Sequence, residues 1–156
     1  MIDYDLRPYR PCVGIVLINT SKQVFVGQRL DNSVEAWQMP QGGIDDGETA
    51  VEAGFREMME EIGTNNAEII AEHSQWLDYD IPINLANRLW QGQFKGQSQK
   101  WLAFHYLGDD SDININTAEP EFRAWKWAEP EALPNLAVPF KRDVYQNIIS
   151  EFAELF

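Results

Sequence analysis

The chain has 156 residues, of which 44% are hydrophobic and 12% aromatic, and it carries a formal net charge of −13. This length and apolar content predict a single domain, residues 1–156, with an ample core. A chain this acidic is not suited to grip a long nucleic-acid tract by neutralising its phosphates. Its one cysteine, Cys12, excludes an intramolecular disulfide. The longest apolar stretch, Val13–Ile18, is too short to span a membrane, and residues 1–11 lack a signal-peptide pattern, so we expect a cytoplasmic protein without a membrane partner.

Apolar runs bounded by turn residues predict the elements of the chain. The first part is expected to contain an extended lead-in at Arg7–Pro11, a strand at Val13–Ile18, a turn at Asn19–Lys22, a strand at Gln23–Gln28, a polar loop at Leu30–Ala36 and a helix from Glu48 or Thr49 to Gly63. The middle part is expected to contain a strand at Ala67–Trp76, a shorter strand or turn at Tyr79–Pro82, and a long polar loop at Ile83–Gln99 that allows a helical turn. The last part is expected to contain a strand at Lys100–Leu107, an acidic loop at Gly108–Glu121, a strand at Phe122–Ala128, a short helix at Pro130–Leu133 and a terminal helix at Lys141–Leu155. This order predicts an α/β fold with a mixed sheet between the two long helices.

Three carboxylates gather on one sector of the helix that ends at Gly63. At 100° per residue, Glu57, Glu60 and Glu61 are neighbours, with small residues beneath them that leave an open floor. The opposite side gathers the bulky residues Val51, Phe55, Met58, Met59 and Ile62. We expect the carboxylates to repel one another, because Arg56 lies to one side of their face. Such a cluster suits Mg²⁺ or Mn²⁺, which take oxygen ligands, and the alternative is a solvated acidic helix face.

The stretch Gly42–Thr64 resembles the Nudix box. Glu48 follows Gly42 after five residues, and Arg56-Glu57-Met58-x-Glu60-Glu61-x-Gly63 follows after seven more. Every fixed position matches except the last, usually aliphatic and here Thr64, which affects a local packing contact. The resemblance implies a Nudix-type α/β/α sandwich that hydrolyses a nucleoside diphosphate linked to another group. It also implies Glu57, Glu60 and Glu61 as ligands of Mg²⁺ or Mn²⁺, with more than one ion when substrate is bound.

Further acidic residues are candidates for the general base. One of the three helix glutamates takes this role, or a carboxylate from elsewhere, such as Glu121, which is also a candidate metal ligand at the edge of the cleft. The alternative for Glu121 is a solvated loop acid. Glu48 and Arg56 fit a structural ion pair at least as well as a catalytic role. Gly42 and Gly43 give the backbone freedom at the mouth of the site, and we assign them to substrate binding.

Short motifs outside the box resemble the bacterial RNA pyrophosphohydrolases, a group that overlaps the dinucleoside polyphosphate hydrolases. These motifs are Tyr9-Arg10-Pro11, Trp37–Gly43, Gln99-Lys100-Trp101, Pro120-Glu121-Phe122 and Phe140–Tyr145. Residues 83–96 match nothing. The resemblance implies that Arg10, Arg29 and Lys141 contact phosphates or base edges. It implies Tyr79 and Phe140 as rings that stack on a base. Arg10 and Lys141 have the alternative of ordinary surface cations, and Phe140 that of a core residue.

Four functions fit these residues. The first is an RNA 5′-pyrophosphohydrolase, which leaves a 5′-monophosphate and initiates mRNA decay. The second is a hydrolase of dinucleoside polyphosphates such as diadenosine tetraphosphate, which the acidic net charge favours. A non-catalytic nucleotide sensor is disfavoured by the complete glutamate set. A hydrolase of oxidised mononucleotides leaves the Ile83–Gln99 excursion without a use. His73 and His105 have no metal-like spacing, and we assign them no role.

Overall fold

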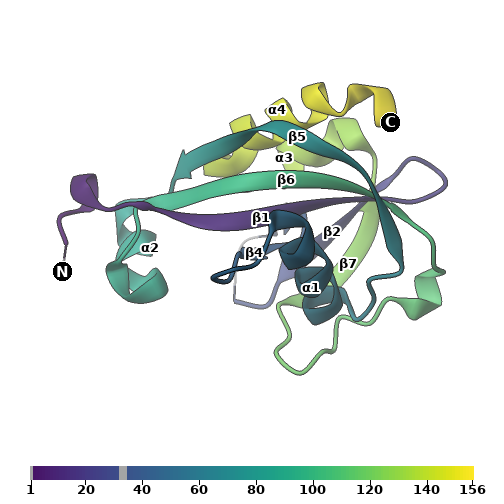
Figure 1. Cartoon of the computed structure of the whole chain (residues 1–156), viewed down its shortest axis with the longest axis horizontal. Coiled ribbons are helices and arrows are strands. Elements are labelled where there is room, and N and C mark those ends of the chain that lie inside the picture. The colour runs from purple at the N-terminus through teal and green to yellow at the C-terminus, as the bar shows by residue number, and fades with distance from the viewer. Residues whose placement is uncertain (1, 32–34) are drawn as a thin grey trace.

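The computed structural model describes residues 2–31 and 35–156 (Figure 1). Its strands are β1 (Tyr9–Ile18), β2 (Val24–Arg29), β3 (Trp37–Gln38), β4 (Gln41–Gly43), β5 (Ala67–Asp80), β6 (Gly96–Tyr106) and β7 (Phe122–Ala128). Its α-helices are α1 (Ala50–Ile62), α2 (Ile83–Arg88), α3 (Leu133–Leu136) and α4 (Arg142–Glu151). Short 3₁₀ turns are η1 (Tyr4–Leu6), η2 (Leu89–Gly92), η3 (Asp110–Asp112), η4 (Pro130–Ala132), η5 (Pro139–Lys141) and η6 (Ala153–Leu155).

The strands of the described residues form one mixed sheet. Its main order is β3-β2-β1-β6-β5, while β4 pairs with β1 and β7 pairs with β2. The β1–β6 pair is parallel and runs from Tyr9 opposite Gly96 to Ile18 opposite His105, whereas the other pairs are antiparallel. This parallel register places Arg10 directly opposite Gln97, a neighbourhood on which the site depends.

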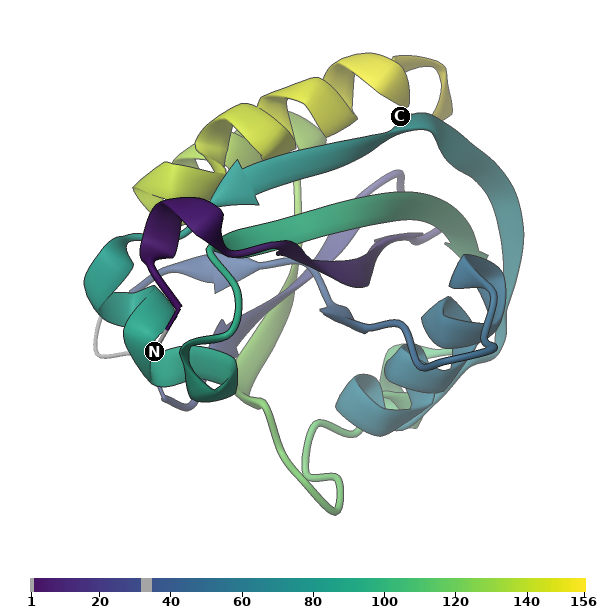
Figure 2. The same cartoon turned by 60° about the vertical axis from the view of Figure 1, so that its left-hand side comes forward.

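Side chains alternate between two cores on opposite faces of the sheet, as the period of a strand requires. Val13, Ile15 and Leu17 of β1 pack with Leu102 and Phe104 on the face that α1 covers. The alternate residues of the same strands join a second cluster with α4: Val16, Ile18, Trp101, Ala103, Val144, Tyr145 and Ile148. Figures 1 and 2 show α1 on one side of the sheet and α3 with α4 on the other. The predicted α/β/α sandwich is confirmed.

The predicted strands are correct in place, and β7 also in its bounds, but some of the others differ in length. The strand expected at Ala67–Trp76 continues to Asp80, because β5 keeps pairing with β6 after a register shift between Glu72 and Trp76. The long loop expected at Ile83–Gln99 is wrong: it holds α2 and η2, and β6 already begins at Gly96. Two-residue and three-residue strands, β3 and β4, were not predicted, since so short a segment is defined only by its partner strand. The predicted loop Leu30–Ala36 includes residues 32–34, which lie outside the described residues.

No helix in the described part of the chain has the length and apolar character needed to cross a lipid bilayer.

Candidate active site

Helix α1 begins and ends as its sequence predicts. Thr49 caps the first turn: its hydroxyl accepts from the backbone N–H of Glu52 at 3.1 Å, and the Glu52 carboxylate accepts from the backbone N–H of Thr49 at 3.0 Å. Gly63 ends the helix with φ 75°, a left-handed conformation that glycine adopts without a steric penalty. The helix is therefore fixed at both termini, and the glutamates between them have defined directions.

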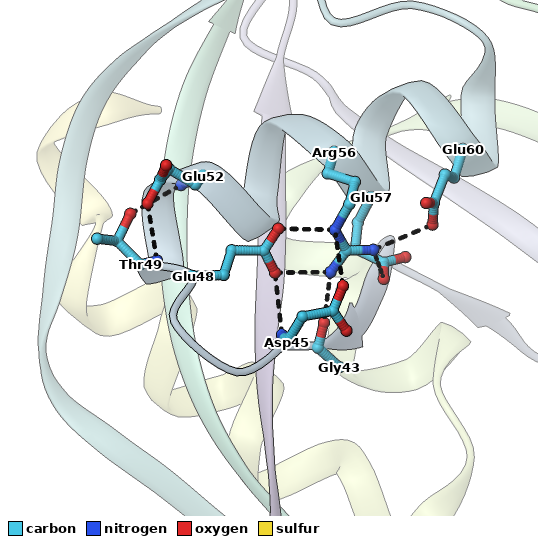
Figure 3. A network of polar contacts seen from close by, with 8 residues as sticks. All are labelled: Gly43, Asp45, Glu48, Thr49, Glu52, Arg56, Glu57 and Glu60. Atoms are coloured by element: carbon cyan, nitrogen blue, oxygen red, sulfur yellow. Dashed lines mark hydrogen bonds and ion pairs between the residues drawn. The ribbon is translucent and has the colours of Figure 1, made fainter.

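Arg56 is the centre of the polar network at the start of α1 (Figure 3). Its guanidinium donates to Glu48 at 2.7 and 2.8 Å, to the carbonyl of Gly43 at 2.8 Å, to Glu57 at 2.9 Å and to Glu60 at 3.1 Å. The expectation that no cation relieves the carboxylates is thus wrong, because the flexible Arg56 side chain reaches back over the helix. Its bonds hold the pKa of Glu48 down at about 2, so this pair is an ion pair at neutral pH. It ties the loop before α1 to the helix.

Glu57 and Glu61 are buried on the sheet-facing side of α1. They are 9% and 6% exposed. Burial raises the pKa of Glu57, against the opposing charge of Arg56. Burial raises the pKa of Glu61 further, and the charges of Glu57 and Glu121 act in the same direction. Oε2 of Glu61 has no hydrogen-bond partner among the described residues, although its solvent access is lost. Two buried acids with an unsatisfied oxygen form a site that favours a cation.

Gly42 is what makes room for Glu57. A Cβ atom at Gly42 would lie 2.0 Å from the Glu57 carboxyl carbon, so any side chain here would displace that carboxylate. Glycine is therefore required at position 42, because the Glu57 carboxylate packs directly on the β4 backbone there.

The expected arrangement of the helix faces needs correction. Gly54 packs closely on Leu102 and Phe104, and Ala53 is buried, so the small residues let α1 approach the sheet and leave no open floor. Met59, expected in the core, is 46% exposed. The expected separation of a carboxylate face from a core face is wrong, because the Glu57 and Glu61 side chains are themselves buried. Glu60 is the exposed member of the three, with 58% of its side chain accessible.

The oxygen ligands that Glu57, Glu60 and Glu61 offer suit a divalent cation, but the three carboxylates do not converge on one point. Within residues 2–31 and 35–156, no group of three or more acidic, histidine or cysteine side chains already converges on one point. Glu57 and Glu61 offer buried oxygens. Glu60 lies about one turn after Glu57 and directly precedes Glu61. A rotation of the exposed Glu60 away from Arg56 would bring a third carboxylate, because its only bond at 3.1 Å is at the surface.

Glu121 and Arg29 form a second charged group close to Glu61. Arg29 forms a two-pronged ion pair with Asp31, both bonds 2.7 Å long, and its Nη2 lies 3.6 Å from Glu121 Oε2. The charge of Glu121 contributes to the raised pKa of Glu61, whereas the charge of Arg29 opposes it. The loop acid and the strand arginine therefore lie within electrostatic reach of Glu61. Asp31 was not predicted, and its place two residues after Arg29 is a weak signal.

Lys141 is a buried cation without a carboxylate partner in the described structure. Its ammonium group donates to the side-chain carbonyls of Gln38 at 3.3 Å and Gln41 at 3.4 Å. Burial lowers the pKa of Lys141 to about 8, and the charge of Arg29 acts in the same direction. Lys141, Gln38 and Arg29 line a small hollow between β3 and η5, together with Trp37 and Val138. The alternative of an ordinary surface cation is thus wrong for Lys141.

A chain of buried amides orients the groups around Lys141. The Trp101 indole N–H, which can only donate, bonds to Gln99 Oε1 at 3.1 Å. Gln99 must then use its amide N–H₂ on Gln41, whose Oε1 accepts at 2.8 Å. Because Gln41 Oε1 accepts from Gln99, this oxygen atom lies on the side of Gln41 where it also accepts from the Lys141 ammonium group. The site roles of Gln38, Gln97 and Gln99 were not predicted, because Gln97 and Gln99 lie in a polar stretch that becomes a strand only by pairing with β1.

Tyr79 and Phe140 come together, but as a stacked pair. Their ring centroids are 6.0 Å apart with an interplanar angle of 27°. Tyr79 is 7% exposed and accepts a bond from Gln97 at 2.6 Å, while Gln97 accepts from Arg10 at 2.9 Å. Tyr79 therefore supports Phe140 from beneath, and its burial does not fit the expected direct contact with a base. Phe140 keeps a partly exposed ring.

Known proteins similar to this chain agree with the geometry. A family model described as NUDIX domain matches residues 8–148. The protein named RNA pyrophosphohydrolase from Rhodospirillum rubrum is 58% identical over 146 residues, covering 94% of this chain and 88% of that protein. The protein of the same name from Sphingopyxis alaskensis is 50% identical over 157 residues, covering 99% of each chain.

Solved structures of low sequence identity share the fold. The dihydroneopterin triphosphate pyrophosphohydrolase of E. coli has a TM-score of 0.68 at 21% identity, covering 92% of this chain and 99% of that one. The Ap4A hydrolase of C. elegans, in a binary complex, has a TM-score of 0.63 at 19% identity, covering 92% and 98%. Given the sandwich, the glutamates of α1 and the family match over residues 8–148, the chain belongs to the NUDIX family.

Proposed function

We propose that the chain is a metal-dependent pyrophosphohydrolase that acts on the 5′ end of RNA. It removes phosphate or pyrophosphate, leaves a 5′-monophosphate and thereby initiates mRNA decay in the cytoplasm. The observation that carries this proposal is the buried pair Glu57 and Glu61 against Gly42, with one Glu61 oxygen unsatisfied. The choice of substrate is supported by relatives named RNA pyrophosphohydrolase at 48–58% identity over nearly the whole chain.

Nudix hydrolases generally use divalent metal ions, and the acids of α1 suit that chemistry. Glu57, Glu60 and Glu61 would hold Mg²⁺ or Mn²⁺, with more than one ion when substrate is bound. Divalent metal supplies charge neutralisation on the phosphates and acidifies an attacking water. Glu121, across the site beside Arg29, serves as a further ligand or as the general base. The pair Glu48–Arg56 is a structural link that holds the loop against the helix.

The remaining residues form the substrate pocket. Arg10, Arg29 and Lys141 hold the phosphate chain or base edges through charge-assisted bonds. Phe140 stacks on a base with Tyr79 as its support, because Phe140 has the accessible ring. Gly42 and Gly43 contribute to the pocket by leaving the space that the Glu57 carboxylate and the Arg10 guanidinium occupy.

A second candidate function is the hydrolysis of diadenosine tetraphosphate. The net charge of −13 favours it, because a small substrate experiences less repulsion from the surface than a polyanion does. Both substrates present a base, a ribose and a phosphate chain, so one pocket accepts either.

The test is a side-by-side comparison of kcat/KM. One reaction contains a short RNA with a 5′-triphosphate or 5′-diphosphate, the other diadenosine tetraphosphate, both with Mg²⁺. A higher value for RNA with conversion to a 5′-monophosphate is expected, and a clear preference for the dinucleotide would favour the second function. Activity should vanish with a chelator and return with Mg²⁺ or Mn²⁺. Hydrolysis that needs no metal, or binding without hydrolysis, would contradict both candidates.

A further inference from the structure

The segment between β5 and β6, residues 81–95, is an excursion closed at its base. The backbone N–H of Ile81 donates to the carbonyl of Lys95 at 2.9 Å, and the N–H of Lys95 donates to the carbonyl of Pro8 at 3.1 Å. Arg7 donates to the Asn87 side chain at 2.7 Å, which ties α2 to the N-terminal residues. Figures 1 and 2 show α2 and η2 beside the N-terminal end of β1. These hydrogen bonds hold residues 81–95 in a defined position beside the N-terminal residues.

Its tip has an unfavourable backbone conformation. Trp90 (φ 48°, ψ 38°), Gln91 (φ 60°, ψ 26°) and Gly92 (φ 69°) are left-handed in succession. For Trp90 and Gln91 this conformation is sterically costly, and it persists only where the surroundings determine it. The effect of the turn is to direct the Trp90 ring inward. There it contacts Phe94 edge-on, with centroids 5.9 Å apart, and covers Arg10.

The Arg10 guanidinium is held on three sides. Its central carbon lies 4.8 Å from the Trp90 ring centroid. Its Nη1 donates to Gln97 at 2.9 Å. Its Nη2 lies against Gly43, where an added Cβ would come within 2.4 Å. The side chain thus rests between an aromatic face and the backbone at the mouth of the site.

Arg10 differs from the other arginines of the site in how its charge is balanced. Arg29 and Arg56 each form ion pairs with carboxylates, whereas Arg10 forms none with the described residues. A carboxylate would fix the guanidinium but would also neutralise it. An aromatic ring fixes the guanidinium by its quadrupole and leaves the full charge for an incoming anion. In a chain of net charge −13, such an unneutralised cation is a site for a phosphate group.

We propose that Trp90 is a positioning residue that holds the Arg10 guanidinium flat against Gly43, so that its free N–H groups meet the terminal phosphates of a 5′-triphosphate or 5′-diphosphate. The inference deepens the proposed function and rests on it for the identity of the substrate. It also gives residues 83–96 a use: they carry the ring that orients a phosphate-binding cation.

The test compares Trp90→Leu and Trp90→Phe in KM and kcat for the 5′-triphosphate RNA. Trp90→Leu should raise KM about tenfold with little change in kcat, while Trp90→Phe, which keeps an aromatic face, should raise KM about threefold or less. The effects of Trp90→Leu and Arg10→Ala on KM should not be additive. In a protein that already carries Arg10→Ala, Trp90→Leu should raise KM by less than about twofold, because the guanidinium that it orients is gone. The matched control is Trp76→Leu, an exposed tryptophan on β5, which should leave KM unchanged.

Two further measurements keep the outcome decisive. Arg10→Lys leaves Trp90 in place but removes the planar group that lies on its ring, so it should raise KM even if Trp90→Leu lowers the melting temperature. Binding of inorganic tripolyphosphate with Ca²⁺, measured by calorimetry, should weaken in the same variants without any turnover. Equal effects of Trp90→Leu with and without Arg10 would overturn the inference while the proposed function stands. Loss of tripolyphosphate binding in a protein that hydrolyses neither substrate would support the inference and contradict the proposed function.

Discussion

At the scale of single residues, the site consists of charged groups that have no ion-pair partner of opposite charge, or that have an unsatisfied oxygen, among the described residues. Glu61 is buried with an unsatisfied oxygen, Lys141 is buried with only amide acceptors, and Arg10 lies on an aromatic ring. Each would gain from a partner that the described residues do not supply: a metal ion for the acid and phosphate oxygens for the cations. The groups with full internal partners, Arg56 and Glu48, are the structural ones.

Glu61→Gln should separate function from stability. Removing the carboxylate should lower kcat/KM by about a hundredfold or more, the size typical for losing one group that stabilises transition-state charge. Because burial raises the pKa of Glu61, its charged form is disfavoured in the folded protein, so at neutral pH without metal the variant should melt at the same or a higher temperature. Turnover assays and thermal denaturation in chelator check this. A marked fall in melting temperature would show that the charge stabilises the fold.

Lys141 should produce an alkaline limb in the pH profile. Its pKa is lowered to about 8, so in the free enzyme the ammonium group loses its proton as pH rises through that value, and phosphate binding weakens. Its effect on stability has the opposite sign: the cost of burying the charge is relieved as pH rises from about 8 towards the unfolded value. We expect kcat/KM to fall above about pH 8 in the parent and to stay level in Lys141→Arg. The same limb in both proteins would assign the titration to another group.

At the scale of elements, α1 is held by two devices with separate tasks. The capping box of Thr49 and Glu52 stabilises the first turn, and Arg56 connects the helix to Glu48 and to the backbone of Gly43. The first device faces away from the acids of the site, whereas the second reaches Glu57 and Glu60 directly (Figure 3). Substitutions in the two should therefore have different consequences.

Thr49→Ala should lower stability by about 1 kcal/mol, the usual cost of losing an N-cap side chain. Turnover should change by less than twofold, because the glutamates of the site lie two turns further along the helix. Glu52→Gln is the control, since glutamine also completes a capping box, and it should be close to neutral. Urea unfolding and steady-state kinetics measure both effects. A loss of turnover in Thr49→Ala comparable to that in Glu61→Gln would mean that the cap also orders the site.

Elements were predictable where their pattern is local. The bounds of α1 follow from Thr49 and Gly63, and β7 was predicted at Phe122–Ala128 as found. The start of β6 was not, because Gly96–Gln99 is polar and glycine-containing and becomes a strand only through its parallel pairing with β1. The same holds for α2, whose six residues are too few to form a stable helix without the contacts of the excursion.

At the scale of the whole molecule, the acidic surface repels a polyanion, whereas the cations of the site attract one. The chain carries −13 overall, yet Arg29 and Lys141 line one hollow, and Arg10 and Lys141 both approach Tyr79, Arg10 by way of Gln97; we propose that these three cations receive the phosphates. Recognition should therefore be confined to the end of a nucleic acid, because beyond the site the surface repels its backbone.

Lengthening the RNA should not improve binding. We expect KM for a 5′-triphosphate RNA of about 30 nucleotides to be no lower than that for one of about 3, and its dependence on monovalent salt to be shallow, because few phosphates are neutralised. The measurement is KM for both lengths over a range of KCl at fixed free Mg²⁺. A steep loss of affinity for the longer RNA with added salt would show an extended basic contact and contradict this.

The sequence alone determined the family, the sandwich and the limits of α1, and it named the candidate glutamates, because these depend on local periodicity, caps and a motif with fixed spacing. Only the tertiary structure decided the state of each group. It showed that Arg56 relieves the carboxylates, that Tyr79 lies beneath Phe140, and that Trp90 covers Arg10. Burial, pKa and pairing depend on neighbours that are distant in the chain: Arg10 and Trp90 are 80 residues apart and meet because β1 and β6 run side by side.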